Sequence, residues 1–123
     1  MNGCGSHLLL ECDAVAPARL RDPEWLENTL LAAAEAAGAT VLYGHFHHFG
    51  GAQGVTGVLL LRESHITIHT WPEFGYAAID VFMCGQAQPR LAVDCLVRLL
   101  QPGRSRWKEV ARGPLGTVTP GAA

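Results

Sequence analysis

The stretch "HITIHTWPEFGYAAIDVFMC", residues 65–84, decides the fold of this 123-residue chain. Apolar and polar side chains alternate over residues 65–71, a pattern typical of a half-buried β-strand. The turn-forming residues "PEFG" follow, and "YAAIDVFMC" at residues 76–84 then reads as a second strand. The stretch therefore predicts an antiparallel β-hairpin.

The segments before this hairpin predict a strand, a helix and two further strands. "SHLLLECDAV", residues 6–15, has the composition of a strand. "RDPEWLENTLLAAAEAAG", residues 21–38, predicts a helix with Asp22 as its N-cap. "TVLYGHFHHF" and "VTGVLLL", residues 40–49 and 55–61, predict two strands joined by a glycine-rich loop.

The segments after the hairpin predict a helix and a last strand. "PRLAVDCLVRLLQPG", residues 89–103, predicts an amphipathic helix, with a core face made of Leu91, Ala92, Cys95, Leu96 and Leu99. "RWKEVAR", residues 106–112, predicts a strand, and we expect residues 113–123 to form a disordered tail. The predicted fold class is α/β: a two-layer α/β sandwich with an antiparallel sheet and two helices on one face.

Composition limits the classes of function. With 49% apolar and 16% charged residues, the chain suits one domain, which we place at residues 1–112. Nine scattered Lys and Arg residues and a net charge of −2 favour neither nucleic acid nor a membrane surface as partner. The start "MNGCGSHLLL" lacks the pattern of a signal peptide, and no apolar run reaches the length of a spanning helix. We therefore expect a cytoplasmic protein with a small-molecule partner.

The grouping of the histidines raises the hypothesis of a metal-binding site. "HFHH" at residues 45–48 and "HITIH" at residues 65–69 offer five imidazoles on two strands, so a site made of histidines alone is sterically possible. Such sites usually include carboxylate or thiolate ligands, and histidines on half-buried strands are commonly just hydrogen-bonded in place. We expect no metal.

Two residues are candidate nucleophiles. Ser64 stands between Glu63 and His65, so it lacks the G-x-S-x-G elbow of a hydrolase. Cys84 follows apolar residues and precedes a glycine, a context that suits a reactive thiol and a buried inert thiol equally well. The four cysteines form no C-x-x-C pair, and we expect reduced thiols.

A longer run adds a family resemblance. "ESHITIHTWPEFGYAAIDVFMCG", with "GATVLYGHFHHF" and "GVTGVLLL" upstream, resembles the short bacterial and archaeal S-adenosylmethionine decarboxylase proenzymes over residues 5–112. In that family the serine attacks the preceding carbonyl and the backbone breaks. The resemblance therefore implies self-cleavage after Glu63 into residues 1–63 and 64–123. Ser64 becomes a covalent pyruvoyl cofactor that forms a Schiff base with the substrate.

The resemblance also implies roles for three further residues. His69 matches the family's processing histidine, and Thr56 stands where the family usually has a serine that assists processing. Cys84 matches the catalytic cysteine, which donates a proton to the substrate carbanion after CO₂ leaves. The implied activity is decarboxylation of S-adenosylmethionine, which feeds aminopropyl groups to spermidine and polyamine synthesis.

Substrate recognition is implied less specifically. Phe49 matches a family position that stacks on adenine, and Trp71 and Glu73 lie in the family's substrate-pocket segment. The loop "FGGAQGVTG", residues 49–57, departs from the family, which commonly has a Pro-containing loop ending in "GVSG". An alternative is therefore decarboxylation of ornithine or arginine, whose cationic end would need a carboxylate such as Glu73 or Asp80.

Strand geometry bears on the assembly. Ser64 and His69 are five residues apart, so in an extended strand they lie about 16 Å apart and point to opposite faces. The resemblance implies a homodimer with active sites at its interface. We expect one chain to supply Ser64 and Cys84, and the other to supply Thr56, His69 and Phe49. A non-catalytic regulatory paralogue is the remaining alternative, and the joint presence of Ser64, His69 and Cys84 argues against it.

Overall fold

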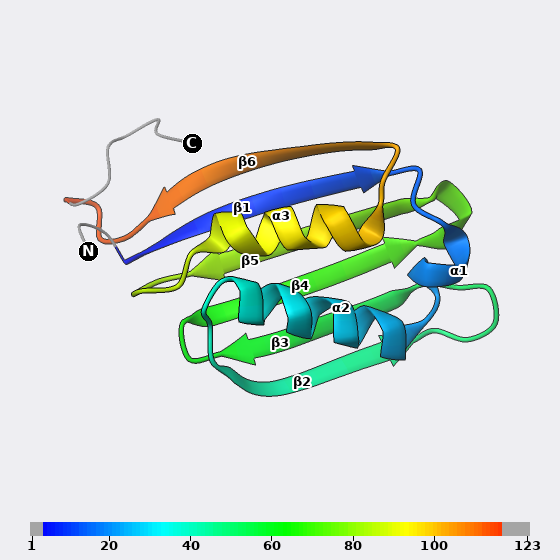
Figure 1. The fold of residues 1–123 in the computed structure, drawn as a ribbon, viewed down its shortest axis with the longest axis horizontal. Helices are drawn as coiled ribbons and strands as arrows, with labels where there is room; N and C mark the ends of the chain where they lie inside the picture. Colours follow the sequence, from blue (N-terminus) through cyan, green and yellow to red (C-terminus); the bar gives the residue numbers. More distant parts are fainter. Residues whose placement is uncertain (1–3, 117–123) are drawn as a thin grey trace.

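A computed structural model describes residues 4–116, which form one six-stranded sheet with helices packed on it (Figure 1). The strands are β1 (Gly5–Asp13), β2 (Val41–His48), β3 (Val55–Leu61), β4 (Ser64–Trp71), β5 (Tyr76–Met83) and β6 (Arg104–Arg112). The helices are α1 (Pro17–Leu20), α2 (Pro23–Ala36), the 3₁₀ turn η1 (Pro72–Phe74) and α3 (Pro89–Leu100). Every predicted strand and both predicted helices are present, and the single-turn α1 is an addition to them.

The sheet is antiparallel throughout, in the order β2-β3-β4-β5-β1-β6. The hairpin predicted for residues 65–84 is β4–β5, in which Ser64 pairs with Met83 and Trp71 with Tyr76. Its turn contains η1 and closes at Gly75, whose φ of +62° is favourable only without a side chain. The hairpin therefore lies at the centre of the sheet and fixes the positions of its neighbours.

The hydrophobic core lies between the sheet and the two long helices. Figure 1 shows α2 and α3 side by side on one face, with α2 nearer β2 and β3 and α3 nearer β1 and β5. On β4 this face carries Ile66 and Ile68, both fully buried, with Thr70 next in the same row. The two-layer α/β sandwich is confirmed, because on each of the four inner strands β1, β3, β4 and β5 only one face carries the fully buried apolar side chains.

The opposite face has no helix over it within residues 4–116, and we call it the open face. Strand alternation and register place on it His7, Leu9, Glu11, Thr56, Val58, Leu60, His65, Thr67, His69, Ala78, Asp80 and Phe82. Leu60 is 46% exposed there, although β3 is an inner strand of the sheet. Most of the candidate chemistry therefore lies on the open face or at its ends.

The helices differ from the sequence prediction in one respect. Asp22 caps α2 as expected, because its carboxylate accepts a hydrogen bond of 3.0 Å from the Trp25 N–H. On α3 the predicted core residue Leu91 is 41% exposed, while Val93 and Leu100 are buried. That part of the prediction was wrong, because rotation of about 100° per residue groups Val93 with Leu96 and Leu100 rather than with Leu91.

None of the helices in residues 4–116 combines the length and the apolar character that crossing a bilayer requires. Of the predicted tail, residues 113–116 follow β6 as turn and bend, and residues 117–123 lie outside the described part of the chain.

Candidate active site

Ser64 begins β4 with a strained backbone. Its φ is +141°, whereas side chains of L-residues strongly favour negative values. Pairing with Leu61 on β3 and Met83 on β5 holds the residue in place on both sides. A conformation of this kind costs about 1–3 kcal/mol, and here that energy is stored beside the peptide bond between Glu63 and Ser64.

The carbonyl group of the same peptide bond is held by Cys84. The backbone N–H of Cys84 donates to the Glu63 oxygen at 3.0 Å, and the thiol donates to it at 3.1 Å. Two donors on one carbonyl oxygen polarise the carbon toward a nucleophile and can stabilise a negative charge that develops on the oxygen. The structure thus brings together Glu63, Ser64 and Cys84, three residues that sequence reasoning selected.

Two further hydrogen bonds hold the turn between β3 and β4, residues 62–63, against Thr40. The Glu63 carboxylate accepts a hydrogen bond of 2.9 Å from the Thr40 N–H, and the Arg62 N–H donates to the Thr40 carbonyl at 2.9 Å. Sequence reasoning missed Thr40, which lies 23 residues before Glu63. No local pattern could have revealed it, because the contact depends on how β2 and β3 pair.

The cysteines occupy four different environments. Cys12 is fully buried, and burial raises the pKa of its thiol to about 12, with smaller contributions from the adjacent Glu11 and Asp13. Cys95 is buried on α3, and Cys4 is exposed. Cys84 is part-buried at the strained peptide. Its location, rather than its sequence context, separates it from the packing cysteines.

A cavity of about 240 Å³ opens at the far end of β4. It is lined by Phe49, Gln53, Gly54, Thr56, His69, Thr70, Trp71 and Glu73. Thr56 and His69 are cross-strand partners, and the Thr56 hydroxyl lies 3.2 Å from Nδ1 of His69. All five residues predicted for processing assistance and substrate binding lie here. Gln53 was not predicted, and the only signal for it was the unusual loop that contains it.

Aromatic contacts shape both sides of the cavity. Phe49 is 54% exposed and meets His47 edge-on, with ring centroids 4.7 Å apart. Trp71 stacks on Tyr76 at 5.2 Å. The Tyr76 hydroxyl donates to the Glu11 carboxylate, and this hydrogen bond is the main reason why the pKa of Tyr76 is raised to about 12. Phe49 and Trp71 therefore present apolar ring surface with fixed orientations.

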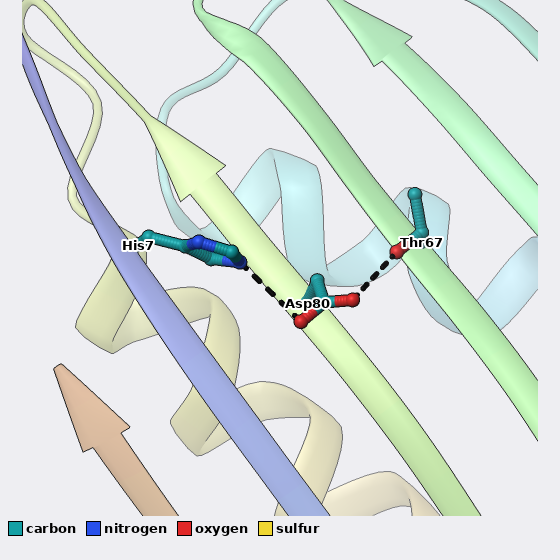
Figure 2. Close-up of polar contacts among 3 residues, drawn as sticks. All are labelled: His7, Thr67 and Asp80. Atoms are coloured by element: carbon teal, nitrogen blue, oxygen red, sulfur yellow. Dashed lines mark hydrogen bonds and ion pairs between the residues drawn. The ribbon is translucent and has the colours of Figure 1, made fainter. Parts of the chain in front are cut away.

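Asp80 belongs to a different cluster at the centre of the open face. Figure 2 shows its two oxygens directed to two partners: Nε2 of His7 at 3.3 Å and the Thr67 hydroxyl at 3.3 Å. Burial, followed by the nearby His7, lowers the pKa of His65 beside them. Asp80 does not line the cavity that contains Phe49, whereas Glu73 does. Of the two carboxylates predicted for a cationic substrate, Glu73 alone lines this cavity.

Ser64 and His69 do not meet within one chain. Both lie on β4, with Ser64 at its first residue and His69 two residues before its end. Their side chains belong to alternate rows of the strand, and an extended strand separates them by about 16 Å. Thr56 and Phe49 lie with His69, while Cys84 lies with Ser64. The candidate residues therefore form two half-sites at opposite ends of the sheet.

The histidines are not gathered around a common point in the described part of the chain. Within residues 4–116, no three His, Cys, Asp or Glu side chains are grouped so that they could hold a metal ion. His48 instead donates from Nε2 to the Gln53 carbonyl at 3.1 Å.

Comparisons with known proteins agree on one family. Residues 6–113 match the family model described as S-adenosylmethionine decarboxylase. A protein of Thermodesulfovibrio yellowstonii named S-adenosylmethionine decarboxylase proenzyme is 40% identical over 114 residues, which cover 92% of this chain and 84% of the relative. A protein of the same name from Caldanaerobacter subterraneus is 45% identical, and the match covers 92% of this chain and 91% of that relative. The crystal structure of the adenosylmethionine decarboxylase from Aquifex aeolicus superposes with a TM-score of 0.83 at 34% identity. The superposition covers 92% of this chain and 93% of that one.

Proposed function

The chain belongs to the S-adenosylmethionine decarboxylase family, and from that premise we propose that it is a proenzyme that cuts itself between Glu63 and Ser64 and then decarboxylates S-adenosylmethionine. The decarboxylated product supplies the aminopropyl group for spermidine and other polyamines. The observation that carries this proposal is the strained Ser64 peptide, whose carbonyl oxygen accepts two hydrogen bonds from Cys84.

Self-cleavage begins with an acyl shift. The Ser64 hydroxyl attacks the Glu63 carbonyl carbon, the bond from that carbon to the Ser64 nitrogen breaks, and the nitrogen takes up the hydroxyl proton. The amide becomes an ester, and the strain at Ser64 is relieved. The N–H and thiol of Cys84 stabilise the negative charge on the Glu63 oxygen while the shift takes place.

Breaking the ester requires a base. Removal of the Ser64 α-proton expels Glu63 as a free carboxylate and leaves a double bond, and water then releases the nitrogen as ammonia and leaves a ketone. We assign the proton abstraction to His69, whose Nδ1 is held by the Thr56 hydroxyl. The Thr56 hydroxyl replaces the serine hydroxyl that is usual in the family, so this positioning contact is retained.

The pyruvoyl group so formed supplies a carbonyl that reacts with the substrate amine and withdraws electrons as CO₂ leaves. The residues around Ser64 suit such a group, because the Cys84 thiol lies beside the same peptide and offers the proton that the substrate carbon then needs. In the cavity, Phe49 offers a ring face for the adenine, and Trp71 and Glu73 offer an aromatic face and a carboxylate for a sulfonium cation.

The separation of the two half-sites supports a homodimer. The open face carries exposed apolar side chains such as Leu60, and a second copy is the occupant that could cover it and complete both sites together. A two-fold axis across this face would bring the Ser64 end of each β4 to the His69 end of the other. Each active site would then combine Ser64 and Cys84 of one protomer with Thr56, His69 and Phe49 of the other.

Two measurements on the purified protein test the proposed function. Intact-mass spectrometry should show two chains, corresponding to residues 1–63 and 64–123, with a pyruvoyl group at the start of the second. Assays for CO₂ release should show turnover of S-adenosylmethionine and little or none of ornithine or arginine. Complete cleavage without release of CO₂ from S-adenosylmethionine would contradict the proposed activity, and an uncut active chain would contradict the self-cleavage.

A further inference from the structure

The loop between β2 and β3, residues 49–54, is held rigidly despite its three glycines. The Phe49 N–H donates to the Gly54 carbonyl at 3.1 Å, and the Gln53 N–H donates to the Gly50 carbonyl at 2.9 Å. His48 reaches over from β2 and donates to the Gln53 carbonyl at 3.1 Å. These bonds close a tight turn and fix the backbone of Gln53 on both sides.

The base of the loop is packed against β4. A Cβ atom at Gly54 would lie 2.0 Å from the carbonyl oxygen of Thr70, so only glycine allows this approach. At the tip, a Cβ on Gly50 or Gly51 would meet no atom within 4 Å. The turn therefore extends outward while its base is fixed, and Gln53 stands at the border between the two parts.

Gln53 lines the cavity together with Phe49 and Glu73. Its backbone is satisfied, but its amide group makes no hydrogen bond within residues 4–116. An exposed glutamine on a surface loop is ordinarily solvated and without function. This one differs because two hydrogen bonds fix its backbone and because it borders the cavity beside an exposed aromatic ring.

A carboxamide is chemically matched to adenine. It offers one acceptor and a donor in one plane, and on its N6/N7 edge adenine offers the 6-amino donor beside the N7 acceptor. On that edge a 6-oxo purine presents two acceptors, O6 and N7, so a carboxamide in either orientation cannot make a donor-acceptor pair of bonds with it. A base stacked on Phe49 would have one of its edges within the cavity that Gln53 lines.

We propose that Gln53 determines the preference of this enzyme for a 6-aminopurine, by forming paired hydrogen bonds with the N6/N7 edge of an adenine that stacks on Phe49. This inference rests on the proposed function, because it takes the cavity as the site of the nucleoside part of S-adenosylmethionine. Gln53 acts in recognition and takes no part in proton transfer, so its loss should raise KM and leave kcat nearly unchanged.

The test compares S-adenosylmethionine with the analogue in which a 6-oxo group replaces the 6-amino group. The wild-type enzyme should favour the amino substrate in kcat/KM by roughly 10- to 100-fold, the discrimination expected of one bidentate contact. Gln53→Leu, which keeps the volume and removes the amide, should lose most of that preference through a higher KM for S-adenosylmethionine. Ala52→Ser, in the same loop but outside the cavity lining, should keep it.

Intact-mass spectrometry and the kinetic assays together distinguish failure of this inference from failure of the proposed function. All three proteins should be fully cleaved, because neither Gln53 nor Ala52 is assigned a part in the acyl shift or in the proton abstraction. If the wild type prefers the 6-amino substrate and Gln53→Leu shows the same ratio of kcat/KM values, Gln53 does not determine the preference. The inference would also be overturned if Ala52→Ser lost the kcat/KM preference for the 6-amino substrate as completely as Gln53→Leu. A cleaved wild type that turns over neither substrate would overturn the proposed function, and this inference with it.

Discussion

Cys84 donates two hydrogen bonds to the carbonyl oxygen of Glu63, one from its backbone N–H at 3.0 Å and one from its thiol at 3.1 Å. One residue thus contacts the bond that self-cleavage would break and lies next to Ser64, which would become the reactive carbonyl. Its backbone can serve the first reaction and its thiol the second. Substitutions at Cys84 should therefore separate processing from turnover.

Ser64→Ala should remain a single chain of 123 residues without decarboxylase activity, because the nucleophile and the precursor of the carbonyl are both lost. Intact-mass spectrometry and CO₂ release check the two outcomes. Ser105→Ala is the matched control, since Ser105 is exposed on β6 far from the turn. An active, uncut Ser64→Ala protein would contradict the mechanism.

Cys84→Ala should still cleave, because the backbone N–H remains, but roughly fivefold more slowly for the loss of about 1 kcal/mol from the thiol hydrogen bond. Turnover of the cleaved protein should fall far more, by roughly 100-fold or more, because the proton donor is gone. Timed mass spectra and steady-state assays give the two rates. Cys4→Ala should match the wild type in both, and full activity in Cys84→Ala would make this cysteine a packing residue.

Mixed dimers test the division of the site. Ser64→Ala and His69→Ala should each fail to cleave alone. When they are co-expressed with different tags, each mixed dimer should hold one complete site, so the His69→Ala chain should be cut by the histidine of its partner. Absence of cleavage in verified mixed dimers would show that His69 acts on its own chain.

The contact between Thr56 and His69 predicts that substitutions of Thr56 slow self-cleavage only when they remove the hydroxyl. Thr56→Ser keeps the hydroxyl and should cleave at about the wild-type rate. Thr56→Val keeps the shape but loses the 3.2 Å contact with Nδ1, so cleavage should slow roughly five- to tenfold. The half-time of cleavage in freshly translated protein measures the effect. Equal rates for the two variants would mean that the hydroxyl does not position His69.

Cys12 predicts a loss of stability at alkaline pH. Burial raises the pKa of its thiol from 9.0 to about 12, so between these values the unfolded chain loses this proton while the folded chain keeps it. The stabilising contribution is complete below pH 9 and should fall by about 1.4 kcal/mol per pH unit above it. Urea unfolding under reducing conditions, with Ser64→Ala present to keep one chain, should show this decline.

The control for that measurement is the same protein with Cys12→Ala in addition. It lacks the thiol, so the difference in unfolding free energy between the two proteins should shift against the thiol-containing one as pH rises from 9 to 11. A constant difference over that range would mean that the Cys12 thiol ionises equally readily in the folded and unfolded chains.

Much of the fold was predictable because its signals are local. Alternation in residues 65–71 and the "PEFG" turn identify the β4–β5 hairpin, and Asp22 with the residues after it identifies α2. The error at Leu91 has a local cause too. Both faces of α3 carry leucines, so periodicity alone could not decide which of them the sheet would cover.

Local sequence also singled out the candidate reactive residues, because the run around Ser64 closely resembles one family. Simple strand geometry predicted that Ser64 and His69 could not meet in one chain. The division of the site between two protomers and the individual catalytic roles remain predictions, for which the mixed-dimer and substitution experiments are the tests.

Only the tertiary structure revealed the contacts between distant segments. The Thr40 N–H on the Glu63 carboxylate, the two Cys84 donors on the Glu63 carbonyl, and the place of Gln53 in the cavity each join residues from different strands or loops. Such contacts depend on strand order and register, which arise when the whole sheet pairs and buries one face. The sequence by itself determined the elements and the chemistry available, whereas the pairing of the strands decided which groups meet.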